Sequence, residues 1–121
     1  MRIGIGTVAA VSLLGLGLVA GPAQARANPA CYANHNGTLQ CGNTAPTPIY
    51  STSNSDNPRI HQVDTLRSNP SWFKCWIRGS RHSGGNNIWY YTYGDDSHRW
   101  GYVPAGKVFT PKDPMPGVNH C

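Results

Sequence analysis

Histidines are the first side chains to consider as metal ligands or catalytic bases. The chain has five, all in segments that we expect to be loops or strand ends: His35, His61, His82, His98 and His120. None belongs to an H-x-H or H-E-x-x-H motif, and no other ligand spacing is present. Because metal sites are usually built from recognisably spaced ligands, we expect solvated histidines, with neither a metal nor another cofactor.

The acidic residues give no better basis for catalysis. Glutamate is absent, and the aspartates are Asp56, Asp64, Asp95, Asp96 and Asp113. Asp95 and Asp96 are adjacent and follow Gly94, so their side chains diverge and suit a tight turn better than paired acid–base work. The sequence also lacks a G-x-S-x-G motif for a nucleophilic serine. We therefore predict that the protein is not an enzyme.

The remaining reactive side chains are four cysteines: Cys31, Cys41, Cys75 and Cys121. An even number in a short exported chain is typical of a disulfide framework, and no C-x-x-C motif points to zinc or redox chemistry. Three pairings are possible, and we favour Cys31–Cys41 with Cys75–Cys121. A hairpin loop over 35–37, with Gly37 in the left-handed conformation, places Cys31 opposite Cys41. The second bridge would tie the last residue to a predicted central strand.

Aromatic residues are the set with the clearest potential for binding. Of the twelve in the chain, ten lie between Trp72 and Phe109. If Tyr90 faces the core, strand alternation and the matching alternation of the next strand place five rings on the outer face of the sheet: Trp89, Tyr91, Tyr93, Trp100 and Tyr102. These rings form a binding surface, or they are covered by the N-terminal extension or by the C-terminal tail.

Short strands must position these rings. Charged residues make up 12% of the chain, which also holds 14 glycines and 10 prolines. This composition excludes a coiled coil, a multidomain enzyme and a disordered tail, and it indicates a turn-rich all-β domain. We expect a loop over 79–87, a tight corner at 104–106 before 107–109, and strands over 47–50, 59–66, 72–78, 88–93 and 100–103.

The first 25 residues have the parts of a secretory signal peptide. A basic start at Arg2 precedes an apolar stretch, a Gly-Pro pair and an A-x-A site, so we expect cleavage after Ala25 or Ala27. A membrane anchor is the alternative, because the apolar stretch is long enough to span a bilayer. The rest would comprise an extension over 28–46, carrying the Cys31–Cys41 hairpin, and a domain over 47–121.

The segment Ile88-Trp-Tyr-Tyr, followed by Trp100-Gly-Tyr-Val-Pro-Ala and Val108, resembles the second half of a Src-homology-3-like domain. The closest likeness is to stand-alone secreted members from actinobacteria, and it covers about residues 46–110. The resemblance implies a small five-stranded β-barrel that binds extended chains. Eukaryotic members bind polyproline helices, whereas bacterial members often hold cell-wall hydrolases on peptidoglycan.

Carried over by position, Trp89 matches the groove tryptophan of this family, Pro104 the groove proline and Tyr50 the aromatic residue of the first strand. Lys107 stands where polyproline-binding members have a tyrosine, which argues against polyproline as the ligand. The loop over 79–87 and the two disulfides are additions to the family pattern.

Together these features predict a secreted, non-catalytic binding module for cell-wall glycan or extended peptide. The expected binding residues are Tyr50, Trp89, Tyr91, Trp100, Tyr102 and Pro104. A protein-interaction or inhibitory module acting on another exported protein through the 79–87 loop, and a basic antimicrobial protein, are the alternatives. The net charge of +5 falls to +4 or +3 once the leader with Arg2, and in the second case also Arg26, is removed; this charge suits anionic wall polymers, whereas export argues against nucleic acid. We expect a monomer with no membrane partner once the leader is removed.

Overall fold

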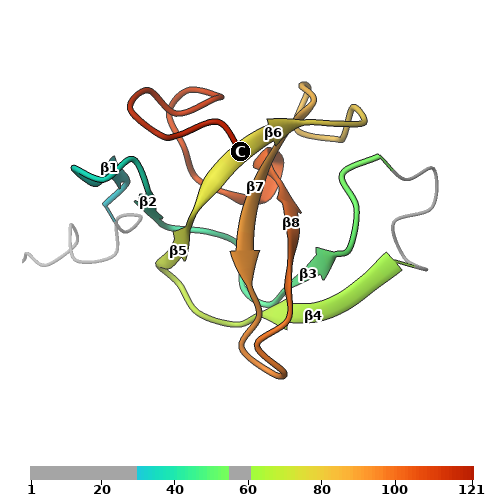
Figure 1. Ribbon diagram of the computed structural model, residues 1–121. Helices are drawn as coiled ribbons and strands as arrows, with labels where there is room; N and C mark the ends of the chain where they lie inside the picture. The colour runs from blue at the N-terminus through green and yellow to red at the C-terminus, as the bar shows by residue number, and fades with distance from the viewer. Residues whose placement is uncertain (1–29, 55–60) are drawn as a thin grey trace, which may run out of the picture.

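The computed structural model describes residues 30–54 and 61–121 of the chain (Figure 1). In this part of the chain, eight strands form two antiparallel sheets, and a short 3-10 helix follows the last strand. The described residues include no α-helix, which confirms the all-β prediction. No helix among the described residues has the length and apolar character that crossing a membrane requires. The predicted leader over 1–25 and the start of the strand predicted over 59–66 lie outside the described residues.

The smaller sheet is built on the N-terminal hairpin and has the order β1-β2-β5. Its strands are β1 (Tyr32–Ala33), β2 (Leu39–Cys41) and β5 (Ser71–Phe73). The hairpin closes as predicted, because Asn34 N–H donates to Thr38 O and Gly37 has a φ of +86°. A left-handed residue at this point is what a three-residue hairpin loop requires. The predicted Cys31–Cys41 disulfide is confirmed.

The larger sheet carries most of the predicted strands and has the order β4-β3-β8-β7-β6. Its strands are β3 (Thr47–Tyr50), β4 (Gln62–Leu66), β6 (Cys75–Arg78), β7 (Ile88–Tyr93) and β8 (Trp100–Pro104). The sequence predicts β3 and β7 with these bounds, and β8 continues one residue further than expected. The corner predicted at 104–106 is the 3-10 helix η4 (Ala105–Lys107), and directly after it Val108 forms a single bridge with Asn43.

The strand predicted over 72–78 is interrupted at Lys74, which separates β5 from β6. Lys74 N–H donates to Tyr91 O, and the next residue, Cys75, is also the register partner of Tyr91. Two residues facing one is the arrangement of a β-bulge, which shifts the alternation of the strand. Phe73 packs on the core residue Tyr90, whereas Cys75 and Ile77 are the register partners of Tyr91 and Trp89, so alternation does not run unbroken through the strand predicted over 72–78.

Both sheets contribute to one hydrophobic core. Tyr90 is its largest fully buried side chain and packs edge to face on Phe73, with ring centroids 5.9 Å apart. The flanking residues Ile88 and Thr92 are buried as well, so the predicted inward face of β7 is confirmed. Because alternate residues of a strand point to opposite sides, Trp89, Tyr91 and Tyr93 must project from the other face of the sheet.

The C-terminal segment is fastened to β6 (Figure 1). The predicted Cys75–Cys121 disulfide is confirmed, but β6 is an edge strand and not the central strand that we expected. Trp76 N–H donates to Asn119 O, and Cys121 N–H donates to Trp76 O. These bonds cover an edge that would otherwise leave backbone groups unpaired.

Candidate functional site

Five rings gather on the outer face of β5, β7 and β8, and we call this cluster the aromatic face: Trp72, Tyr91, Tyr93, Trp100 and Tyr102. Cross-strand register brings them together, because Tyr91 lies opposite Tyr102 and Tyr93 lies opposite Trp100. Tyr91 stacks on Trp100 with ring centroids 5.2 Å apart and an interplanar angle of 23°. Trp72 closes the cluster from β5, with its ring centroid 6.1 Å from that of Trp100.

The aromatic face is open to solvent over much of its area. Trp100 is 44% exposed and Tyr93 is 41% exposed, while Trp72, Tyr91 and Tyr102 are half-buried. Single exposed apolar residues are common on proteins, but contiguous ones mark interaction surfaces. The prediction that several rings share an exposed outer face is therefore confirmed for Tyr91, Tyr93, Trp100 and Tyr102.

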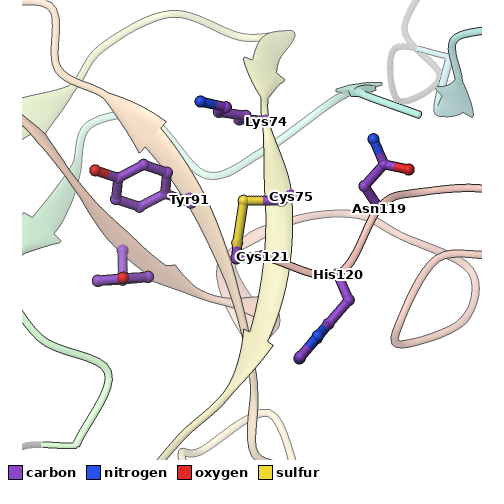
Figure 2. Close-up of a pocket in the computed structure, with 7 residues that line it drawn as sticks. Lys74, Cys75, Tyr91, Asn119, His120 and Cys121 are labelled. Atoms are coloured by element: carbon purple, nitrogen blue, oxygen red, sulfur yellow. A yellow bond between two sulfur atoms is a disulfide. The ribbon is translucent and has the colours of Figure 1, made fainter. Parts of the chain in front are cut away.

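Lys74 lies at one end of the aromatic face, and its Nζ is 5.7 Å from the centroid of the Trp100 ring. Beside it is a hollow of about 320 Å³, lined by Lys74, Cys75, Tyr91, Tyr102, Asn119, His120 and Cys121. Figure 2 shows Lys74 and Tyr91 on one side of the Cys75–Cys121 disulfide, with Asn119 and His120 on the other. The bulge at Lys74 creates this hollow, because it turns Cys75 to the outer face.

Trp89 does not belong to the aromatic face, although it projects from the same side of β7. It is only 3% exposed, its indole N–H donates to Ser80 O at 2.9 Å, and the His82 ring packs edge to face on it at 5.6 Å. The expectation that Trp89 is an exposed ring is therefore wrong. Among the described residues it is the loop over 79–87, and not the extension or the tail, that covers it.

The six residues predicted to bind form two groups. Tyr91, Trp100 and Tyr102 lie together in the aromatic face, whereas Tyr50 and Pro104 neighbour the buried Trp89. The Tyr50 and Trp89 ring centroids are 6.2 Å apart, and Pro104 is the register partner of Trp89 on β8. Tyr50 is also the register partner of Tyr102, so the two groups adjoin.

Sequence reasoning missed two members of the site, Trp72 and Lys74. Strand alternation could have identified both residues. Trp72 and Lys74 are the neighbours of Phe73 in the chain, so they are expected on the face of the strand away from the core. Tyr93 was assigned to the outer face from alternation, and it is in the cluster as well. The sequence did not indicate that β5 runs beside β7, which is what brings Trp72 to the other rings. A hydrogen bond from Thr92 Oγ1 to Trp72 O joins the two strands.

The described carboxylates hold the fold together, and Asp95 also lines a small cavity with Trp72 and Tyr93 of the aromatic face. Asp95 accepts N–H groups of Arg67 and Ser68, and Asp96 pairs with the Arg67 guanidinium at 2.7 Å. That hydrogen bond lowers the pKa of Asp96 below its usual value. Asp113 accepts from the Tyr90 hydroxyl, and burial together with this carboxylate raises the pKa of the phenol far above its usual value.

Asp64 is the most buried of these carboxylates, at 5% exposure, and it fixes the turn between β7 and β8. Its oxygens accept four backbone N–H groups, those of Thr65, Asp96, Ser97 and Arg99. Burial alone would raise the pKa of Asp64, but these hydrogen bonds outweigh it and hold the pKa below its usual value. An ionised Asp64 is thus a structural element of the β7–β8 hairpin.

Cations in the described part of the chain have few acidic partners. Arg67–Asp96 is the only ion pair found there. The other described cations form no ion pair with a described carboxylate: Lys74, Arg78, Arg81, Arg99, Lys107 and Lys112. No group of three potential metal ligands occurs among the described residues. The site therefore offers rings, one nearby cation and a hollow, which suit binding of a ligand.

Comparison of the chain with family models, with curated proteins and with solved structures finds no match. The resemblance to Src-homology-3-like domains therefore stays a prediction from the residues that carry it.

Proposed function

We propose that the protein is a secreted, non-catalytic binding module that holds a cell-wall glycan on its aromatic face. The observation that carries this proposal is the contiguous cluster of partly exposed rings from β5, β7 and β8. Pyranose rings present faces of C–H groups that pack on aromatic faces, while their hydroxyl groups remain in water. Neighbouring ring centroids 4.9–6.1 Å apart provide a continuous apolar surface for such packing.

Secretion is supported by the two disulfides together with the leader-like first 25 residues. Disulfides persist mainly in oxidising compartments, and the four cysteines of this chain form two bridges. A Src-homology-3-like barrel is the architecture that we propose for residues 47–121. Its support is the hairpin of β7 and β8 followed directly by the 3-10 corner and by the bridge at Val108.

An extended peptide is the alternative ligand of the same surface. The aromatic face would accept it through apolar side chains, but β6 and its covered edge leave no free strand there for backbone pairing. The interaction-module alternative depends on the loop over 79–87, and that loop is engaged in covering Trp89 through Ser80 and His82. These observations make glycan the better-supported ligand.

The test is retention of the purified protein on insoluble cell walls, compared among three single variants. Trp100→Ala and Tyr93→Ala remove exposed rings of the aromatic face, whereas Tyr32→Ala removes a ring that is 50% exposed on β1. We expect the first two to weaken binding about 5- to 150-fold, corresponding to about 1–3 kcal/mol, and the third to leave it unchanged. Removing the peptides from the walls enzymatically should preserve binding.

Wild-type protein that is not retained on cell walls would contradict the proposal, as would equal retention of Trp100→Ala. Loss of binding after peptide removal would identify the peptide as the ligand. Circular dichroism of each variant checks that it is folded, which we expect because these rings are at the surface.

A further inference from the structure

A small polar pocket lies beside two rings of the aromatic face, Trp72 and Tyr93. The centroids of these rings are 6.0 Å apart and their planes are tilted by 54°, so the rings do not stack on each other. The rest of the pocket lining includes Ser68, Ser71 and Asp95, and the volume of the pocket is about 60 Å³. A sugar unit that packs on Tyr93, which is 41% exposed, therefore lies next to hydroxyl and carboxylate groups.

The hydroxyl groups of this pocket use their hydrogen atoms within the protein. Ser71 Oγ donates to Ser68 O at 2.9 Å, so in the 2.7 Å contact between the two serine hydroxyls Ser68 is the donor. Thr92, which also lines the pocket, donates from its Oγ1 to Trp72 O. A hydroxyl group has one hydrogen atom and two lone pairs, so these oxygens have only acceptor capacity left for a ligand.

Asp95 adds a stronger acceptor to the pocket. Its Oδ2 accepts the backbone N–H groups of Arg67 and Ser68 at 2.6 and 2.9 Å, whereas no described residue donates to its Oδ1. The Asp95 side chain is exposed, and hydrogen bonds to a carboxylate are stronger than those to a neutral acceptor. The pocket therefore suits a ligand group that donates hydrogen bonds, such as a hydroxyl or an ammonium group.

We propose that the pocket receives the hydroxymethyl group of a sugar unit packed on the aromatic face, with Asp95 Oδ1 accepting the hydrogen of its hydroxyl. This inference rests on the proposed function of that face. A volume of about 60 Å³ exceeds the about 10–15 Å³ that one water molecule needs and is far below the roughly 300 Å³ of a pocket for a whole ligand. A neutral hydroxyl suits the pocket better than an ammonium group, because Arg67, which bonds to Asp95 through its backbone and pairs with Asp96, would repel a second cation.

The experiment compares two soluble glycans that differ in this group alone. Cellohexaose carries a hydroxymethyl group on every sugar unit, and xylohexaose has the same linkage and ring stereochemistry without it. Each is titrated into the purified protein, and binding is followed by calorimetry. We expect the wild type to bind cellohexaose about tenfold more tightly, as for one hydrogen bond to a charged acceptor.

Two variants test the role of the carboxylate. Asp95→Asn keeps an oxygen for the two backbone N–H groups but replaces the other acceptor, so it should bind both hexasaccharides equally, near the affinity of the wild type for xylohexaose. Asp96→Asn is the matched control, because it removes the same charge from the adjacent residue, which pairs with Arg67 and lies outside the pocket. This control should preserve the preference.

Other outcomes separate this inference from the proposed function. Equal binding of the two hexasaccharides by the wild type, both weakened in Trp100→Ala, would overturn the inference and leave glycan binding standing. Binding of neither, with cell-wall retention intact, would overturn it too. A merely structural role of Asp95 would weaken both ligands alike in Asp95→Asn and keep their ratio, which also contradicts the inference, as does an equal loss of preference in Asp96→Asn. Tighter binding of a glucosamine hexasaccharide than of cellohexaose would assign the pocket to an ammonium group instead. Absence of cell-wall retention would contradict the proposed function itself.

Discussion

Replacing Trp89 with alanine should destabilise the protein strongly. The side chain is 3% exposed, and a buried tryptophan removes about 150–250 Å² from water. At about 25 cal/mol per Å² this is an upper bound of roughly 4–6 kcal/mol. The indole hydrogen bond to Ser80 O contributes about 1 kcal/mol more, and the partial collapse of the site reduces the total. We therefore expect a loss of about 3–5 kcal/mol, as for other buried Trp→Ala changes.

The assay is urea denaturation of the oxidised protein, followed by far-ultraviolet circular dichroism so that the lost indole does not affect the signal. Trp100→Ala is the matched control, because it removes the same side chain from the aromatic face, where it is 44% exposed. We expect this control to cost about 1 kcal/mol or less. Trp89→Phe keeps most of the apolar contact and loses the hydrogen bond, so it should lie between the two.

The binding results should show the opposite order. Trp100→Ala should lose cell-wall retention, whereas Trp89→Ala should keep it in conditions where the variant is folded. A Trp89→Ala protein that is nearly as stable as the wild type but is no longer retained would refute the reasoning. Such a result would mean that the loop over 79–87 opens and that Trp89 contacts the ligand.

Three further predictions concern what holds the site in place. Asp64→Asn should cost about 1–3 kcal/mol at neutral pH, because it leaves buried N–H groups poorly matched. The folded-state pKa of Asp64 lies below its ordinary value of 3.8. The stabilisation that the ionised carboxylate gives the fold is therefore present above about pH 4 and is lost as the pH falls through the folded-state pKa. The difference in urea midpoint between the wild type and Asp64→Asn should shrink over the same range. Replacing Cys75 and Cys121 with serine should cost about 4 kcal/mol in the same assay, from the sequence separation of 46, and should speed amide exchange along the edge of β6. Gly37→Ala should lower the melting temperature more than Gly85→Ala, because both glycines have positive φ but only at Gly37 does a Cβ meet another side chain.

The sequence predicted the elements whose local signals agree with their tertiary surroundings. β7 consists of β-branched and aromatic residues with a buried alternate set, and its bounds match the prediction. The Cys31–Cys41 hairpin also followed from local chemistry, because a glycine in the loop and two cysteines in register suffice to specify it. In both cases neighbouring residues alone carry the information.

The features that the sequence did not predict have a different origin, because they depend on contacts between distant segments. The bulge at Lys74 lies where the strand changes its pairing partner. Before the bulge β5 pairs with β2, and after it β6 pairs with β7. Nothing in the types of residues 72–78 indicates where this change occurs. The burial of Trp89 likewise depends on how the loop over 79–87 folds, and strand alternation gives only the face from which a side chain projects.

The connections at the two ends of β7 explain why one ring is covered while the others stay open. The loop over 79–87 folds over Trp89, and His82 fixes it there by bonding to both Ile88 O and Gly84 N–H. At the opposite end, the turn after Tyr93 is tied to β4 by Asp64 and by the Asp95 N–H bond to Thr65 O. A turn held against β4 is unavailable to cover Tyr93 and Trp100. The buried carboxylate of Asp64 therefore has a consequence for function as well as stability: its loss should release the turn and change the quenching of Trp100 fluorescence by iodide. Unchanged quenching in a folded Asp64→Asn protein would show that the aromatic face stays open for another reason.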